Sequence, residues 1–276
     1  MHRPLAISTT MLDGSITVDG LREAASRGIT HLEIFIPADG QTRDRPSEFD
    51  ADALAEVIGE AGMEVWSVHA PFGGGVDLSH PDELVRRDSV GQIRAACEVA
   101  SALGANCVVA HAGLSTGDAN EREIRRRQSL RSINCLLKCT CRLEVCLAME
   151  YLPANKPRLC NDSAQISEML DLCDGRPGVC LDTNHANLRE SLAAATRALA
   201  ERIVTLHISD NDGEQERHMM PGEGVIDWRE FMDVLDEIGY EGPLVYEAVG
   251  GETLAERMEM TVTSARDVLG WEGPDG

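Results

Sequence analysis

The stretch IVTLHISDNDGEQERHMMPGEG, residues 203–224, joins an apolar strand run to a polar loop. The run from Ile203 to Leu206 is rich in β-branched and apolar residues, which is typical of a buried strand, and His207 follows it directly. In chains built from repeated strand and helix units, the functional side chains lie at the strand ends. We therefore expect His207 to be one ligand of a divalent metal ion, with the other ligands at the ends of other strands.

Similar apolar runs recur along the whole chain, and segments of helical period separate them. Strands are expected at residues 5–7, 31–36, 64–68, 106–110, 145–149, 178–181, 203–206 and 243–246. Helices are expected at residues 17–27, 49–61, 79–103, 121–137, 163–173, 227–238 and 253–268, with an alanine-rich helix before the seventh strand. Continuous apolar runs indicate strands covered on both faces. Eight strand–helix pairs therefore predict an α/β fold, a closed (β/α)8 TIM barrel that forms a single domain over residues 1–276.

The charge balance argues against several classes of partner. The chain has 47 acidic and 25 basic residues, a net charge of −22, so we expect neither nucleic acid nor an anionic membrane as a partner. The first residues lack the apolar core of a signal peptide, and no apolar run approaches the ~20 residues that cross a bilayer. The expected location is the cytoplasm.

The cysteines do not form a disulfide pattern. Their number, nine, is odd, and several lie in apolar strand runs where a thiol packs as a small hydrophobic group. The group Cys135, Cys139, Cys141 and Cys146 could be taken for a zinc site, but it lacks paired CxxC spacing. We expect ordinary core and helix cysteines.

Ionisable side chains recur where the expected strands end. They are the Glu33 region, His69, His111, Glu150, Asp182, His207 and Glu247. Unpaired buried charge is costly, and a metal ion would offset that cost. Three carboxylates and one histidine give a mostly oxygen ligand set, which suits Mn²⁺, Mg²⁺ or Co²⁺, whereas a histidine-rich set would favour Zn²⁺. We expect one divalent metal ion, Mn²⁺ foremost. No nucleotide cofactor is expected, because GxGxxG is absent after the first strand.

Seven short motifs together resemble a known family. They are VHAPF (68–72), AHAG (110–113), MEYL (149–152), LDTNH (181–185), LHISD (206–210), HMMPGEGVIDW (218–228) and YEAV (246–249). The combination is similar to the xylose-isomerase-like barrel superfamily of sugar phosphate isomerases and epimerases. The resemblance implies a metal held by Glu150, Asp182, His207 and Glu247.

The same resemblance implies a reaction and a substrate class. Glu150 and Glu247 would exchange a substrate proton through an enediolate, because a metal that chelates a carbonyl and its neighbouring hydroxyl acidifies the adjacent C–H. A small sugar, phosphorylated or not, or a cyclitol would be the substrate, and the enzyme would be a homo-oligomer, a dimer or a tetramer. The residues expected to bind that substrate are His69, His111, His185, Arg217 and His218.

Three alternatives stay open at this point. A dehydratase of the inosose or dehydroshikimate type would begin with the same proton abstraction and then lose water. An apurinic-site endonuclease with three zinc ions would use the same strand ends together with His185, His218 and Glu216, which stands where such an enzyme would have an aspartate. The net charge of −22 and the lack of a basic loop argue against the nuclease. A barrel that only binds a sugar would leave both glutamates idle.

Overall fold

The computed structural model describes residues 3–12, 16–38, 50–115 and 118–273. The strands are β1 (Leu5–Ser8), β2 (His31–Phe35), β3 (Glu64–His69), β4 (Cys107–Ala110), β5 (Cys146–Glu150), β6 (Gly178–Asp182), β7 (Ile203–His207) and β8 (Leu244–Tyr246). The helices are α1 (Val18–Ala25), α2 (Ala51–Ala61), α3 (Glu83–Ala102), α4 (Ala119–Leu143), α5 (Ser163–Asp171), α6 (Thr183–Asn187), α7 (Leu192–Leu199), α8 (Trp228–Glu237) and α9 (Leu254–Asp267), with short 3-10 turns at Thr9–Met11 and Ala200–Arg202.

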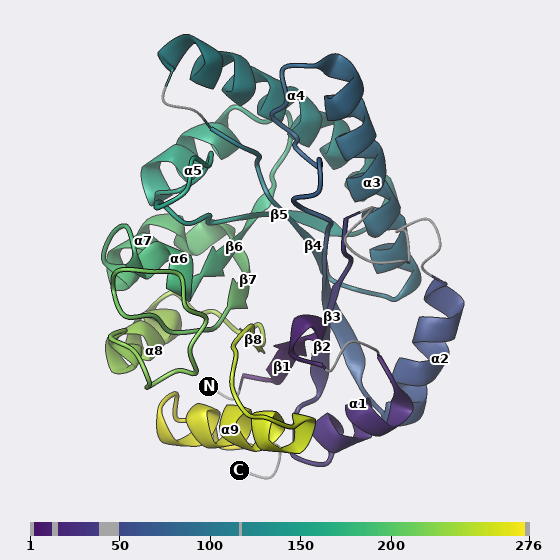
Figure 1. The fold of residues 1–276 in the computed structure, drawn as a ribbon, viewed down its shortest axis with the longest axis vertical. Helices are drawn as coiled ribbons and strands as arrows, with labels where there is room; N and C mark the ends of the chain where they lie inside the picture. The colour runs from purple at the N-terminus through teal and green to yellow at the C-terminus, as the bar shows by residue number, and fades with distance from the viewer. Residues whose placement is uncertain (1–2, 13–15, 39–49, 116–117, 274–276) are drawn as a thin grey trace.

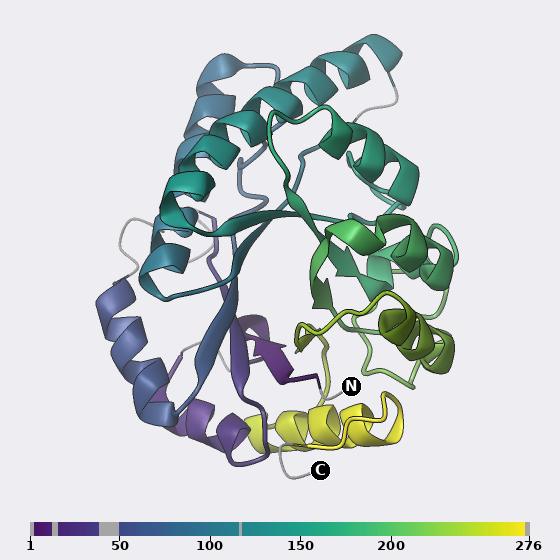
Figure 2. The same cartoon turned by 180° about the vertical axis from the view of Figure 1, so that it is seen from behind.

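The eight strands form one parallel sheet in the order β7-β6-β5-β4-β3-β2-β1-β8. The two end strands meet through Ile208, whose backbone N–H donates to the carbonyl of Val245 at 2.7 Å and whose carbonyl accepts from the N–H of Glu247 at 3.1 Å. These bonds close the sheet into a barrel. Most of the helices surround the strands in a ring, as both cartoon views show (Figures 1 and 2). The predicted (β/α)8 TIM barrel is confirmed.

Aspartate side chains determine where several helices begin. The carboxylate of Asp82 accepts from the backbone N–H of Leu84 at 2.7 Å. The helix expected from residue 79 therefore begins at Glu83, four residues later than predicted. Ser79 stays in the preceding loop because its hydroxyl donates to Asp77 at 2.6 Å.

Helices α4 and α6 also differ from the prediction. Helix α4 was expected over residues 121–137 but continues to Leu143, where Glu144 ends it with a φ of 56° in the left-handed region. The short helix α6 was not predicted at all. It forms directly after β6 because one oxygen of Asp182 accepts from the backbone N–H of His185 at 2.8 Å.

Alternate residues along the strands pack on different sides of the sheet. The larger hydrophobic cluster joins strands to helices, whereas a smaller cluster consists of Cys107, Val109, Ala148 and Cys180, with Cys146 and Val204 packed against it. This smaller cluster comes from strands β4 to β7 and fills the barrel interior. All nine cysteines are free: Cys97, Cys107, Cys160 and Cys180 are buried, whereas Cys135 and Cys141 lie exposed on α4.

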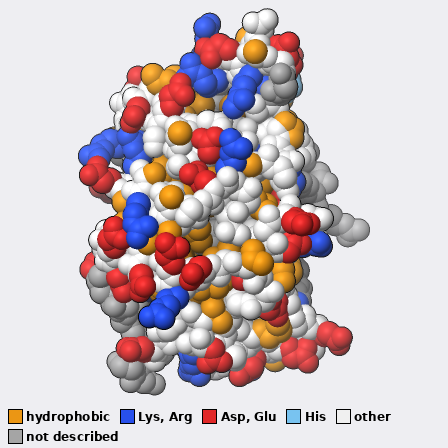
Figure 3. Space-filling view, turned by 90° about the vertical axis from the view of Figure 1, so that its left-hand side faces the viewer, with side chains coloured by type: hydrophobic (Ala, Val, Ile, Leu, Met, Phe, Trp, Pro, Cys, Tyr) orange, Lys and Arg blue, Asp and Glu red, His pale blue; other side chains and the backbone are white. Residues whose placement is uncertain are grey.

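The charged side chains on the outer surface are mixed in sign. On the face in Figure 3, acidic and basic side chains lie next to one another rather than in separate patches. Ion pairs within single helices also place opposite charges side by side, such as Arg87 with Glu83 at 2.8 Å on α3 and Arg127 with Glu123 at 2.7 Å on α4. In the described part of the chain, no helix is both long enough and apolar enough to cross a bilayer.

Candidate metal centre

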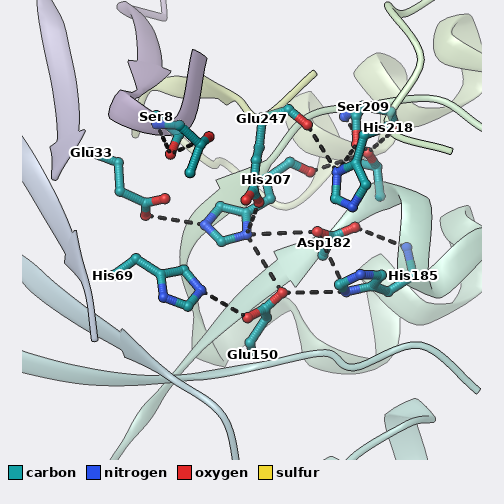
Figure 4. Close-up of polar contacts among 12 residues, drawn as sticks. Ser8, Glu33, His69, Glu150, Asp182, His185, His207, Ser209, His218 and Glu247 are labelled. Carbon is teal, nitrogen blue, oxygen red and sulfur yellow. Dashed lines mark hydrogen bonds and ion pairs between the residues drawn. The ribbon is translucent and has the colours of Figure 1, made fainter. Parts of the chain in front are cut away.

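Four of the predicted residues are the last residues of their strands. His69 ends β3, Glu150 ends β5, Asp182 ends β6 and His207 ends β7. His111 and Glu247 come directly after β4 and β8. Parallel strands in a barrel end at the same rim, so these side chains converge there, and Figure 4 shows most of them pointing toward one another.

His207 lies between four carboxylates. Its Nδ1 is 3.1 Å from Glu247 Oε2, 3.6 Å from Asp182 Oδ2 and 3.7 Å from Glu150 Oε1. Its Nε2 points the other way and lies 3.1 Å from Glu33 Oε2. The ring is fully buried, so neither nitrogen contacts solvent.

Glu150 is shared by three imidazoles besides His207. Its Oε2 lies 3.2 Å from His69 Nε2 and 2.7 Å from His111 Nε2, and its Oε1 lies 3.3 Å from His185 Nδ1. Burial alone would raise the pKa of Glu150, but the neighbouring imidazoles outweigh burial and hold that pKa well below its ordinary value. Glu150 therefore carries a negative charge in the interior of the protein.

Glu247 has the opposite electrostatic environment. Burial raises the pKa of its carboxyl above the ordinary value, and the nearby charges of Glu33 and Glu150 add to that effect despite His207 and His69. The two glutamates predicted to exchange a proton thus differ in the direction of their pKa shifts. Pairs of carboxyl groups whose environments separate their pKa values are typical of acid and base sites.

A second set of ligands lies beside the first. His185 Nε2 is 3.6 Å from Glu216 Oε1, and His218 Nε2 is 3.5 Å from the same oxygen. Burial lowers the pKa of His218, but Glu216, Asp182 and Glu247 together outweigh burial and raise this pKa to about 8. His218 also has a φ of 49°, in the left-handed region that a non-glycine residue enters at a cost. The other oxygen of Glu216 lies 2.5 Å from the ammonium of Lys156.

The structure does not place Arg217 with the other predicted substrate ligands. Its guanidinium is half exposed and pairs with Asp212 Oδ2 at 2.9 Å. Asp212 also accepts from the backbone N–H groups of Glu214 and Gln215, which closes a turn on the surface. Arg217 as a substrate ligand therefore stays a prediction from the resemblance.

The donor set fits a divalent cation. Four overlapping groups of three ligand atoms within 4.8 Å of one another occur among the described residues: His69, His111 and Glu150; Glu150, Asp182 and His185; Asp182, His207 and Glu247; His185, Glu216 and His218. Asp182 Oδ2 and His207 Nδ1 are buried and have no hydrogen-bond partner, so both are left for a cation. The predicted set Glu150, Asp182, His207 and Glu247 could supply four ligands to one ion.

Two residues at the centre were not assigned by the sequence argument. Glu33 was expected near a strand end, but it lies in the middle of β2, where an isolated acidic residue inside an apolar strand run was the available signal. Lys156 lies in the loop after β5 and carries no motif of its own. Both contact the site through partners distant in the sequence.

Comparison with known proteins identifies the family. A family model described as xylose isomerase-like TIM barrel matches residues 21–266. The chain belongs to this family.

The proteins similar to this xylose isomerase-like chain include both a sugar epimerase and an endonuclease. A ketose 3-epimerase of Arthrobacter globiformis is 27% identical over 232 residues, which cover 76% of this chain and 72% of the relative. A probable endonuclease 4 of Shouchella clausii is 29% identical over 224 residues, 74% of each chain. The crystal structure of a D-tagatose 3-epimerase-like protein superposes with a TM-score of 0.81 at 22% identity and covers 98% of each chain, a likeness that concerns the fold.

Proposed function

We propose that the protein is a divalent-metal-dependent isomerase or epimerase of a sugar, a sugar phosphate or a cyclitol. The observation that carries this proposal is the convergence of Glu150, Asp182 and Glu247 on Nδ1 of His207, within 3.1 to 3.7 Å. In the described part of the chain, none of the three carboxylates pairs with a lysine or an arginine, so their charge calls for another cation. The relative named ketose 3-epimerase supports the choice of reaction.

The mechanism assigns separate tasks to residues of this chain. Glu150, Asp182, His207 and Glu247 would hold the ion, Mn²⁺ foremost. When bound, the ion would supply positive charge next to two adjacent substrate oxygens and so lower the energy of negative charge that develops on them. Glu150 and Glu247 come from different strands and lie on two sides of His207 (Figure 4), where one carboxylate can remove a carbon-bound proton and the other can return it.

The histidines around the carboxylates would orient the substrate. His69 and His111 approach Glu150 from one side, and His185 and His218 line the other side of the centre. Ring nitrogens in these positions can bind sugar hydroxyl groups. Phe72 stacks on His111 with ring centroids 4.2 Å apart, so it shields that side of the centre from water. Arg217 would have to leave Asp212 to reach the same substrate.

A multi-metal phosphodiesterase of the endonuclease type is the second candidate. The observation that favours it is the presence of two further ligand groups, His69 with His111 and Glu150, and His185 with Glu216 and His218. The ion pair of Lys156 with Glu216 argues against it, because the ammonium already balances the single carboxylate of the latter group. The net charge of −22 also disfavours a nucleic-acid substrate.

Proton exchange with solvent tests the proposal. The manganese-loaded protein is incubated with a panel of ketoses and inososes in deuterated water, and deuterium incorporation at each carbon is followed by NMR. We expect exchange at one carbon, slowed about 10²- to 10⁴-fold in Glu247→Gln because one proton carrier is lost. The exposed Glu252, changed to Gln, serves as the matched control and should retain the parent rate.

Three outcomes distinguish the alternatives. If Glu247→Gln exchanges as fast as the parent protein, the two-glutamate mechanism is wrong. A product that has lost one water would indicate a dehydratase. Three tightly bound zinc ions in protein purified without added metal, instead of about one ion per chain, would favour the endonuclease. Location in the cytoplasm and assembly into a dimer or tetramer stay predictions.

A further inference from the structure

Glu33 is a buried carboxylate that the proposed reaction does not use. It lies in the middle of β2, and its side chain is inaccessible to solvent. Its Oε2 accepts a hydrogen bond from the hydroxyl of Ser67 at 2.8 Å and lies 3.1 Å from His207 Nε2. Among the described residues, no lysine or arginine forms an ion pair with it, and its contact on this side is the imidazole of His207. A buried carboxylate without a strong cation is costly, so a specific contact must offset that cost.

The contact with His207 determines which nitrogen of the ring faces the carboxylates. Nδ1 points at Glu247 Oε2, Asp182 Oδ2 and Glu150 Oε1, whereas Nε2 points at Glu33. A neutral imidazole carries one proton, and only the bare nitrogen can bind a metal ion. Nδ1 can therefore serve as a ligand when the proton is on Nε2, where the carboxylate of Glu33 accepts it.

We propose that Glu33 is a positioning residue that holds the ring proton of His207 on Nε2 and so presents bare Nδ1 to the metal ion. The inference rests on the metal site of the proposed function. Ser67, next to Glu33 in the sheet register, fixes the accepting oxygen in turn. The chain thus builds a hydroxyl–carboxylate–imidazole series from β3, β2 and β7 that ends at the metal site. Such outer partners of metal-bound histidines orient the ring and raise its basicity as a ligand.

Metal affinity without substrate tests this role. Isothermal titration calorimetry with Mn²⁺ compares the parent with Glu33→Gln, which keeps the shape of the side chain but loses its charge. We expect the dissociation constant of the variant to rise about 10- to 100-fold. Glu64→Gln is the matched control, because Glu64 is an exposed glutamate on the neighbouring strand β3 and should keep the parent affinity.

The ring proton can also be observed in the parent, whether or not the variant folds. Long-range ¹⁵N–¹H correlation spectra of magnesium-loaded protein, labelled with ¹⁵N-histidine, show which nitrogen of His207 is protonated. We expect the proton on Nε2, at a downfield position that moves upfield in Glu33→Gln. A proton on Nδ1 in the parent, or an affinity of Glu33→Gln within twofold of the parent, would overturn the proposal.

The result is separable from that of the exchange experiment. If the protein binds Mn²⁺ as expected but transfers no proton, the proposed function fails while the role of Glu33 holds. If it transfers the proton and Glu33→Gln binds Mn²⁺ like the parent, the role of Glu33 fails alone.

Discussion

Replacing Asp210 with asparagine should destabilise the loop that carries His218. Asp210 follows β7 by three residues and is fully buried. Its Oδ1 accepts from the backbone N–H groups of Asn211 at 2.9 Å and Ile226 at 3.2 Å. Its Oδ2 accepts from the N–H groups of Gly222 at 3.0 Å and Gly224 at 3.1 Å, and from the indole of Trp228 at 2.8 Å. One carboxylate therefore binds five donors and folds residues 219–228 over the barrel end.

The size of the effect follows from counting donors. An asparagine amide has one oxygen, which can take the three donors of Oδ2, but its NH₂ group then faces the N–H groups of Asn211 and Ile226. At least two buried donors lose their acceptor, and each unsatisfied buried donor costs about 1–3 kcal/mol. We expect the free energy of unfolding to fall by about 2–6 kcal/mol, a large share of the roughly 5–15 kcal/mol that stabilises a typical domain.

Urea unfolding of the metal-free protein measures this loss, with circular dichroism for the whole barrel and with the fluorescence of the three tryptophans, of which Trp228 is one. Asp212→Asn is the matched control. Asp212 lies two residues further on, binds Arg217 and two N–H groups at the surface, and should leave the midpoint near that of the parent. If Asp210→Asn unfolds within about 0.5 kcal/mol of the parent, the size of an ordinary surface effect, the five bonds do not stabilise the loop as argued.

Two further predictions concern charge. Burial lowers the pKa of His31 in the folded protein despite Glu64. As the pH falls, His31 is therefore protonated in the unfolded chain before it is protonated in the folded protein. The stability advantage of the parent over His31→Gln should therefore be complete above pH 6.5 and shrink below it in thermal unfolding, and a constant difference would contradict this. Lys156→Met should bind one more Zn²⁺ per chain than the parent by native mass spectrometry, because Glu216 loses its ammonium. Lys138→Met, on the exposed face of α4, is the control, and an unchanged count would refute the argument.

The sequence predicted the barrel because its signals are local. Each strand is a short apolar run, and the strands from β3 to β8 end in an ionisable residue or are followed directly by one, so the positions of His69, Glu150, Asp182 and His207 follow from the alternation alone. Helix boundaries were less accurate. The helix starts at Glu83 because Asp82 caps it, while the hydroxyl of Ser79 donates to Asp77 instead of capping a helix. The sequence alone does not decide which of these residues is the cap.

The residues that support the metal ligands were harder to predict because their contacts are distant in the sequence. Glu33 and His207 are 174 residues apart, and only closure of the barrel brings β2 and β7 to face each other across its interior. Lys156 and Glu216 likewise meet because the loops after β5 and β7 lie over the same rim. A strand-end pattern predicts candidate ligands, but it does not show which strands face each other across the barrel.

Charge pairing around the centre links these distant contacts to the chemistry. Glu216 is balanced by Lys156, and Glu33 is held by His207 and Ser67, so neither carboxylate requires a metal ion. The remaining carboxylates, Glu150, Asp182 and Glu247, share histidines and have no lysine or arginine partner in the described part of the chain. The negative charge that is left unbalanced thus lies at one point, beside Nδ1 of His207. This distribution supports the proposal of one metal ion rather than three, and with it the proposed proton transfer on a sugar.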